Sequence, residues 1–207
     1  MKKYLILATF AAIIACFLFI YFLPKEQKEF SFNPNQIFGN ENAKIEIFEF
    51  SDYQCPFCAK FATQVFPLIK KNFIDKGLVK WYFLDFPLPF HNNAFIAHKA
   101  AKCAGEQGKY LEMHDLLFER QNEWATSSIP KSIFESYAKM LSLNIDLFEN
   151  CLNSNNYDSE IRNSINFGKS KGIKGTPTFF INGKEISGFL PYDEFKKEIE
   201  NIVSQSQ

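Results

Sequence analysis

Between residues 45 and 86 the apolar positions change from a strand pattern to a helical pattern and back. Residues 45–50 (Ile-Glu-Ile-Phe-Glu-Phe) are β-branched and aromatic, which predicts a short, well-buried strand. From residue 56 to about residue 73, apolar side chains recur at spacings of three and four, which predicts a helix that Pro67 should kink. Residues 79–86 predict a second strand. A β-α-β unit of this length implies two parallel strands with a right-handed crossover.

A long helical stretch separates this unit from a second group of strands. Residues 91–168 have helical periodicity and almost no strand character, and we expect four or five helices there, with Pro130 in the first turn of one of them. Residues 178–181 predict a strand, Asn182-Gly183 a hairpin turn, and residues 184–186 its antiparallel return. Pro191 opens a final amphipathic helix to about Val203. This order predicts a compact α/β sheet with a helical block inserted as a lid.

The N-terminal pattern differs from everything that follows. Lys2 and Lys3 precede an unbroken apolar run over residues 4–23, which is long enough to span a bilayer as a helix. The positive charges before the run predict a cytoplasmic N-terminus and an exported remainder. We favour a retained signal anchor, and a cleaved signal peptide remains an alternative. A lipoprotein is the third, because residues 13–16 (Ile-Ile-Ala-Cys) resemble a lipobox.

Composition and charge narrow the classes of function. The chain has 207 residues, 46% of them hydrophobic and 17% aromatic, so one domain can form a core without metal ions or many disulfides. Its formal net charge is zero and no stretch is rich in Lys or Arg, which argues against nucleic-acid binding.

The residues that point to chemistry are Cys55-Pro56-Phe57-Cys58. They follow a predicted strand and open a predicted helix, so Cys55 would lie at the positive end of the helix dipole, which favours the reactive thiolate. Pro56 suits the first helical position, and Cys58, one turn further in, could resolve a mixed disulfide at Cys55. A structural disulfide and half of a zinc site are the alternatives, but the chain's three His residues form no ligand-spaced pair with the other cysteines. We expect no metal site and no cofactor.

Three segments together resemble the DsbA-like branch of the thioredoxin superfamily, and the resemblance covers about residues 36–203. Residues 49–58 (EFSDYQCPFC) are similar to the active-site segment of that family, and residues 175–183 (GTPTFFING) to its cis-proline segment. The stretch from residue 86 to residue 115 resembles its inserted helical domain.

The resemblance implies roles for further residues. Pro177 should follow a cis peptide bond beside Cys55, and the backbone of Thr176 should pair with an extended substrate chain. Glu49 lies where the family has a buried acid that exchanges a proton with the second cysteine, and Glu46 is the less favoured substitute. Two more cysteines resemble a structural disulfide of some members, Cys103 and Cys151.

Two positions depart from the best-known disulfide donors of this family. Phe57 stands where those donors have His, which predicts a weaker oxidant. Thr176 stands where the strongest oxidases have Val, and Thr occurs in members assigned to oxidation and to isomerisation alike. The three histidines are expected to be packing or surface residues.

These inferences give one organisation of the chain. We expect a signal anchor or signal peptide over residues 1–24, a linker over 25–35, the thioredoxin fold over 36–89 and 171–207, and the inserted helical domain over 90–170.

The predicted activity is thiol–disulfide exchange outside the cytoplasm. The chain would donate the Cys55–Cys58 disulfide to exported cysteine-containing proteins, and a membrane redox partner would regenerate it. We expect it in the bacterial periplasm or at the cell-envelope exterior, anchored to the inner membrane. A disulfide isomerase or reductase is the alternative, and a chaperone-like binding module is a third hypothesis.

Overall fold

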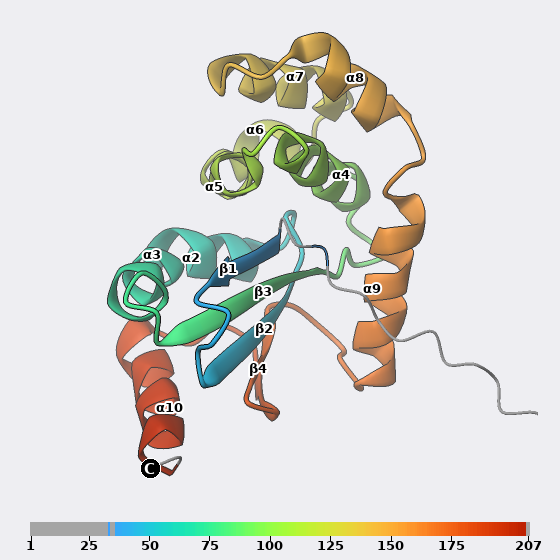
Figure 1. The fold of residues 1–207 in the computed structure, drawn as a ribbon. Coiled ribbons are helices and arrows are strands. Elements are labelled where there is room, and N and C mark those ends of the chain that lie inside the picture. Colours follow the sequence, from blue (N-terminus) through green and yellow to red (C-terminus); the bar gives the residue numbers. More distant parts are fainter. Residues whose placement is uncertain (1–32, 34–35, 206–207) are drawn as a thin grey trace, which may run out of the picture.

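Five strands form one mixed sheet in the computed structural model, which describes residue 33 and residues 36–205. Their order is β1-β3-β2-β4-β5 (Figure 1). β2 and β3 run parallel, and the other neighbouring pairs run antiparallel. The strands are β1 (Ile37–Gly39), β2 (Ile45–Ser51), β3 (Val79–Asp85), β4 (Thr178–Ile181) and β5 (Lys184–Ser187).

The predicted helix after β2 forms with the interruption that its proline requires. α2 (Pro56–Gln64) ends just before α3 (Phe66–Ile69), and a π-helical turn, η2 (Lys70–Ile74), completes the segment. Pro67 has no backbone N–H and cannot bond to the carbonyl four residues earlier, so the regular ladder breaks beside it.

Six helices lie between β3 and β4, a stretch that the structure describes throughout, so the expectation of four or five was slightly low. α6 is only one turn long, too short to leave a periodic signal. The helices are α4 (Ala94–Gly105), α5 (Tyr110–Glu119), α6 (Gln121–Trp124), α7 (Pro130–Met140), α8 (Ile145–Asn153) and α9 (Asp158–Ser170). Pro130 opens α7, as predicted.

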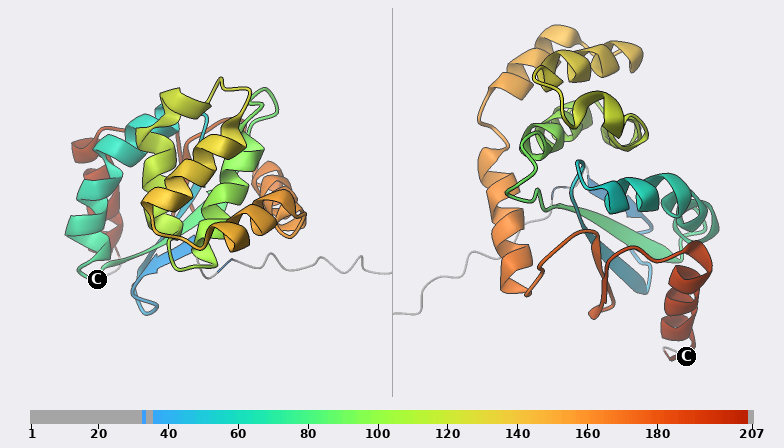
Figure 2. Two further views of the ribbon diagram at one scale, coloured as in Figure 1. Left: turned by 90° about the horizontal axis from the view of Figure 1, so that it is seen from above. Right: turned by 180° about the vertical axis from the view of Figure 1, so that it is seen from behind.

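The two faces of the sheet are covered differently. The larger core joins one face to α2, α3 and the final helix α10 (Tyr192–Gln205), and it continues into the helical layer of α4–α8. On the opposite face, Phe50 and Phe86 pack against α9, where Gly168 lies so close that an added Cβ would meet the Phe86 ring at 2.6 Å. Figure 2 shows α9 as the long connection from the helical layer down to the sheet.

One strand was missed in the sequence. The sequence pattern predicted no strand at residues 37–39, but these residues pair antiparallel with β3, with Ile37 opposite Tyr82. A three-residue strand carries no readable alternation and exists because a neighbouring edge accepts its hydrogen bonds. The proposed domain boundaries remain predictions.

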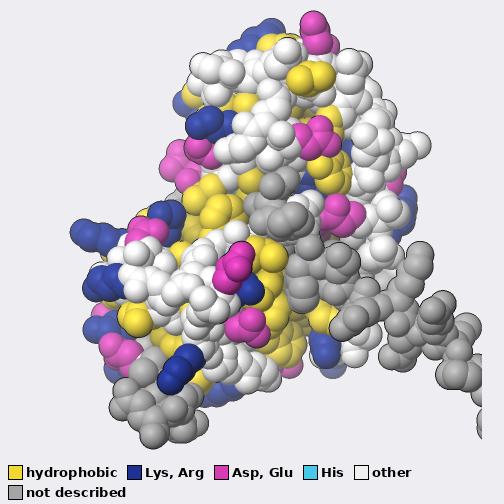
Figure 3. Space-filling view, in the orientation of Figure 1, with side chains coloured by type: hydrophobic (Ala, Val, Ile, Leu, Met, Phe, Trp, Pro, Cys, Tyr) yellow, Lys and Arg dark blue, Asp and Glu magenta, His cyan; other side chains and the backbone are white. Residues whose placement is uncertain are grey.

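Residues 1–24, to which the membrane segment was assigned, lie outside the described residues. Among the helices of residues 36–205, none has the length and apolar character needed to cross a membrane. On the face shown in Figure 3, Lys, Arg, Asp and Glu side chains are interspersed, and apolar side chains gather between the helical layer and the layer of α2 and α3.

Candidate active site

Cys55 and Cys58 lie at the start of α2, just beyond the C-terminal end of β2. Cys55 is the residue before the first helical turn, with extended backbone angles (φ −76°, ψ 124°), and Pro56 takes the first helical position. Both cysteines are free thiols, and Cys58 is fully buried. The local geometry predicted from the sequence is therefore present.

The two thiols differ strongly in acidity. The pKa of Cys55 is lowered to about 6, and the largest cause is a hydrogen bond from the Cys58 thiol. Burial acts in the opposite direction and raises the pKa. The Thr176 side chain and the backbone of Cys58 and Phe57 lower it further. Burial raises the pKa of Cys58 well above its ordinary value, and the neighbouring Cys55 raises it further. At neutral pH the pair therefore holds a reactive thiolate at Cys55 and a protonated thiol at Cys58.

The proline segment lies beside the motif. The Thr176–Pro177 peptide bond is cis, and Cys55 Sγ lies 3.3 Å from the Thr176 carbonyl oxygen, which accepts a hydrogen bond from Cys55 when this residue is a thiol. The Pro177 carbonyl accepts the Gly188 N–H at 2.8 Å, and β4 begins at Thr178. Phe57, between the cysteines, is 59% exposed, so its ring faces solvent and contributes no charge to the site.

Glu49 is the buried acid of the site. It is 1% exposed, and its Oε2 accepts a hydrogen bond from Trp81 Nε1 at 3.2 Å. Burial raises the pKa of Glu49 to about 7, against the opposing effects of Ser51 and Trp81. Glu46, the substitute, is only partly buried, and its carboxylate accepts from the Tyr82 hydroxyl at 2.9 Å. The contrast in burial favours Glu49 as the proton-exchanging acid.

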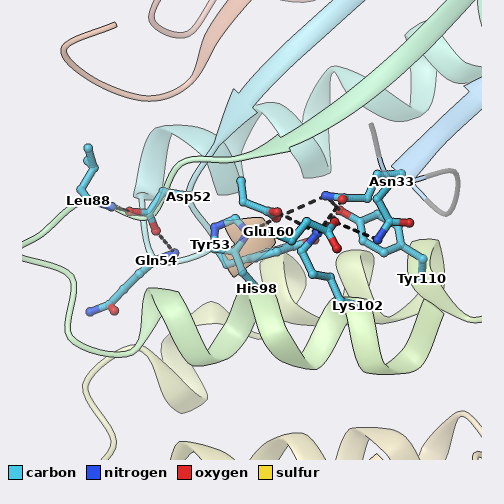
Figure 4. Close-up of polar contacts among 11 residues, drawn as sticks. Asn33, Asp52, Tyr53, Gln54, Leu88, His98, Lys102, Tyr110 and Glu160 are labelled. Carbon is cyan, nitrogen blue, oxygen red and sulfur yellow. Dashed lines mark hydrogen bonds and ion pairs between the residues drawn. The ribbon is translucent and has the colours of Figure 1, made fainter. Parts of the chain in front are cut away.

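Asp52 fixes the turn that leads into Cys55, a role that sequence reasoning did not assign. Its carboxylate accepts the N–H groups of Gln54 and Leu88, each at 2.7 Å (Figure 4). His91 Nδ1 lies 2.7 Å from the same carboxylate. The contacts with Leu88 and His91 span 36 and 39 residues, so no local pattern could reveal them.

The helical layer also holds this turn. Gln121 of α6 donates to the carbonyl oxygens of Tyr53 and Cys55, at 2.7 and 3.1 Å. The Gln54 side chain donates to the Ala125 carbonyl at 2.9 Å and accepts the Asn93 N–H at 2.8 Å. The helical layer thus positions the backbone of the motif.

A buried ionic cluster joins this layer to the sheet (Figure 4). Lys102 of α4 pairs with Asp85 at 2.8 Å and with Glu160 at 2.5 Å. His98 Nδ1 lies 2.7 Å from Asp85, and the His98 ring packs on Tyr53 at a centroid distance of 4.6 Å. Burial alone would raise the pKa of Asp85, but the charges of Lys102 and His98 outweigh it and lower the pKa to about 2. His98 therefore both packs on Tyr53 and interacts with the Asp85 carboxylate.

Two further cysteines of the described residues lie in the helical layer, where Cys103 of α4 and Cys151 of α8 form a disulfide. Within residues 33 and 36–205, no three His, Cys, Asp or Glu side chains are grouped so as to hold a metal ion.

Comparison with known proteins settles the family. A family model described as "Thioredoxin" matches residues 33–201. The chain is 31% identical over 173 residues to the disulfide bond formation protein D of Bacillus subtilis, covering 79% of this chain and 75% of that protein. The chain belongs to the DsbA-like branch of the thioredoxin superfamily. Its relatives there are thiol–disulfide oxidoreductases, and this class of enzyme agrees with the Cys55–Cys58 site.

Solved structures of this branch have the same fold. The oxidised BdbD of Bacillus subtilis superposes with a TM-score of 0.72 at 29% identity, covering 80% of this chain and 91% of that one. The α-DsbA1 of Wolbachia pipientis gives 0.75 at 25% identity, covering 84% and 93%. The chain also matches the Na(+)/H(+) antiporter NhaA 3 of Salinispora tropica at 31% identity, but it spans only 22% of that protein.

Proposed function

We propose that this chain is a dithiol oxidase that donates the Cys55–Cys58 disulfide to exported cysteine-containing proteins. The observation that carries this proposal is the lowered pKa of Cys55, about 6. A thiolate stabilised in the reduced protein has no counterpart in the disulfide form, so the dithiol is favoured and the disulfide becomes a better oxidant.

The exchange has two steps. A substrate thiolate attacks Cys55 Sγ, the S–S bond breaks toward Cys58, and a mixed disulfide forms at Cys55. A second substrate thiolate then attacks the substrate sulfur, and Cys55 leaves as a thiolate. Its lowered pKa makes Cys55 a good leaving group. The substrate is oxidised by two electrons, and a membrane redox partner takes these electrons to restore the Cys55–Cys58 disulfide.

Substrate recognition would use the cis-proline segment. The Thr176 carbonyl lies against Cys55 Sγ at the start of β4, so an extended peptide bound by its backbone would bring a cysteine to the motif. Backbone pairing tolerates many sequences, as oxidation of many clients requires.

The reduction potential of the Cys55–Cys58 pair tests the direction of the reaction. The full-length chain would be equilibrated in glutathione buffers with the Cys103–Cys151 disulfide intact. We expect a potential well above the value of about −270 mV typical of thioredoxin. A value near or below that of thioredoxin would replace the oxidase with a reductase or isomerase.

A trapping experiment tests the substrate class. Cys58→Ala whose Cys55 has first been converted to a mixed disulfide with glutathione should exchange with the thiols of exported proteins, with glutathione as the leaving group. The resulting mixed disulfides at Cys55 should accumulate, because no Cys58 thiol remains to release the bound protein. The matched control, Cys55→Ala, should accumulate none. If binding of unfolded chains survives loss of both cysteines while no mixed disulfides form in Cys58→Ala, the chain is a chaperone-like module instead.

We further propose that residues 1–24 anchor the domain on the outer face of the bacterial inner membrane, near its redox partner. Support comes from the sequence, through Lys2, Lys3 and the apolar run of residues 4–23. Alkaline extraction of membranes should leave the full-length chain in the membrane fraction. A soluble form shortened by the length of this segment would show a cleaved signal peptide.

A further inference from the structure

Two buried oxygen atoms on β2 have unused hydrogen-bonding capacity beside the site. Among the described residues, neither Glu49 Oε1 nor Ser51 Oγ completes a hydrogen bond. Glu49 is 1% exposed and Ser51 is 6% exposed. A buried polar atom without a partner is costly, so such atoms in a native protein often have a functional reason.

The strand geometry places the side chains of Glu49 and Ser51 on the face of the sheet against which α2 packs. Residues two apart in a strand point to the same side of the sheet. Ile45 and Ile47, which share this alternation with Glu49 and Ser51, belong to the core that contains Cys58. Ser51 is the last residue of β2, at the end nearest the active-site turn.

Ser51 affects the pKa of both groups that exchange a proton, Glu49 and Cys58. Burial dominates the raised pKa of Glu49, and the Ser51 side chain is the first group that opposes it. Burial and Cys55 dominate the raised pKa of Cys58, and Ser51 is the first group that opposes them. Glu49 itself is not among the groups that chiefly set the pKa of Cys58. Together with the shared face of β2 and the core that contains Cys58, these effects point to the Ser51 hydroxyl as the polar group that links the acid and the thiol.

We propose that Ser51 is a proton relay between the Glu49 carboxyl and Cys58. A hydroxyl can donate one hydrogen bond while it accepts another, so Ser51 can accept from one partner and donate to the other at the same time. This inference rests on the proposed exchange chemistry and adds a residue to it.

The proton balance is complete within the three side chains. When a substrate thiolate attacks Cys55, the disulfide electron pair leaves on Cys58 as a thiolate. Cys58 Sγ takes the hydroxyl proton of Ser51, while Ser51 Oγ takes the proton of Glu49. The sum converts a neutral Glu49 and a Cys58 thiolate into a Glu49 carboxylate and a Cys58 thiol. The reverse transfer frees the Cys58 thiolate when the pair is oxidised again.

The relay answers a difficulty in the first step. A thiol with a raised pKa is a poor leaving group as a free thiolate. Cys58 is fully buried, so bulk water does not reach it to supply a proton. Protonation by a positioned acid typically accelerates a reaction by about a hundredfold or more.

The test compares Ser51→Ala, Ser51→Thr, Glu49→Gln and the Ser51→Ala/Glu49→Gln double variant in the oxidised full-length chain. Stopped-flow kinetics with a cysteine-containing peptide, normalised to the peptide thiolate, would be followed from roughly pH 5 to pH 9. In the wild type we expect the rate to fall as Glu49 ionises near pH 7. Ser51→Ala should be at least about tenfold slower at low pH and lack this fall, and Ser51→Thr should restore both.

The double variant separates a relay from a structural effect. If Ser51 acts through Glu49, the double variant is no slower than Glu49→Gln alone. If the two substitutions reduce the exchange rate by independent factors that multiply in the double variant, the inference is overturned. A Ser51→Ala variant with the wild-type pH profile also overturns it. A wild-type chain that never exchanges with the peptide refutes the proposed function itself, which is a distinct outcome.

An equilibrium measurement covers the case in which the kinetics are limited by another step. The pKa of Glu49 can be measured from its carboxyl stretch in an infrared titration. This pKa should be higher in Ser51→Ala than in the wild type, because the Ser51 side chain lowers it in the wild type. Ser51→Thr should keep the wild-type midpoint. An unchanged midpoint in Ser51→Ala would contradict the contact on which the relay depends.

Discussion

The carbonyl oxygen of Thr176 lies 3.3 Å from Sγ of Cys55, although the two residues are 121 positions apart in the sequence. This contact brings the proline segment onto the helix that carries the redox motif. Cys55 therefore contacts both halves of the thioredoxin fold, and its environment forms only when β4 pairs with β2.

The acidity of Cys55 should depend on the side chain at position 58. Cys58→Ala should raise the pKa of Cys55 above 6, because the Cys58 thiol is the largest cause of the lowered value. Cys58→Ser keeps a donor at the same place and should raise it less. The pH dependence of alkylation at Cys55, followed by mass spectrometry of its peptide, measures both. Equal values in the two variants would show that the thiol hydrogen bond is unimportant.

Glu49 should make the folded protein less stable as the pH rises. The ordinary pKa of a glutamate carboxyl is 4.5, but burial raises the pKa of Glu49 to about 7 in the folded protein. As the pH rises, the unfolded chain therefore loses this proton before the folded protein does. The free energy of unfolding falls as the pH increases from 4.5 to about 7. The interval corresponds to about 3 kcal/mol, so Glu49→Gln should be more stable than the wild type by up to this amount at pH 8 and equal to it at pH 4.

Urea denaturation at the two pH values measures this difference. The matched control is Glu46→Gln, on the same strand but only partly buried, which should keep the wild-type dependence. A constant difference between Glu49→Gln and the wild type at both pH values would show that Glu49 does not titrate as described.

Lys102 should be essential for stability. Its side chain is fully buried against Asp85 and Glu160. Lys102→Met would leave the negative charge of the buried Asp85 carboxylate only partly neutralised. Breaking a buried pair in this way costs about 3–5 kcal/mol. Lys109→Met, which removes an exposed pair with Glu112, should cost about 0.5 kcal/mol or less. Similar losses in the two variants would contradict the buried cluster.

The disulfide of the helical layer should stabilise the fold without taking part in exchange. Replacing Cys103 and Cys151 together by Ala opens a loop that spans 48 residues, and we expect a loss of about 4 kcal/mol in the free energy of unfolding. The rate of exchange at Cys55 should stay within about twofold of the wild type under conditions where both proteins are folded. A large loss of exchange in the folded variant would give this pair a redox role.

The local parts of the site could be predicted because they depend on neighbours in the sequence. A CxxC motif after a strand, with Pro56 at the first helical position, fixes where the sulfurs lie relative to the helix start whatever surrounds them. Pro67 interrupted its helix for an equally local reason. The cis bond before Pro177 was different: Thr-Pro alone indicates only a turn, and the expectation came from resemblance to the family.

Contacts across the fold could not be predicted in this way. β1 exists because β3 accepts its hydrogen bonds, and the choice between Glu46 and Glu49 is made by how deeply each is covered in the folded protein. The sequence predicted packing or surface positions for the histidines, but it could not name their partners, Asp52 for His91 and Asp85 for His98.

The sequence by itself determined the class of chemistry, the position of the reactive pair and the alternation of strands and helices, because each depends on residues within one or two turns of chain. Only the tertiary structure decided which carboxyl is buried, how Asp52 and Gln121 hold the active-site turn, and that the Ser51 hydroxyl is buried on the same face of β2 as Glu49. The pKa of a group depends on how much water its folded surroundings exclude and on which charges they bring near, and these appear only when distant segments pack together.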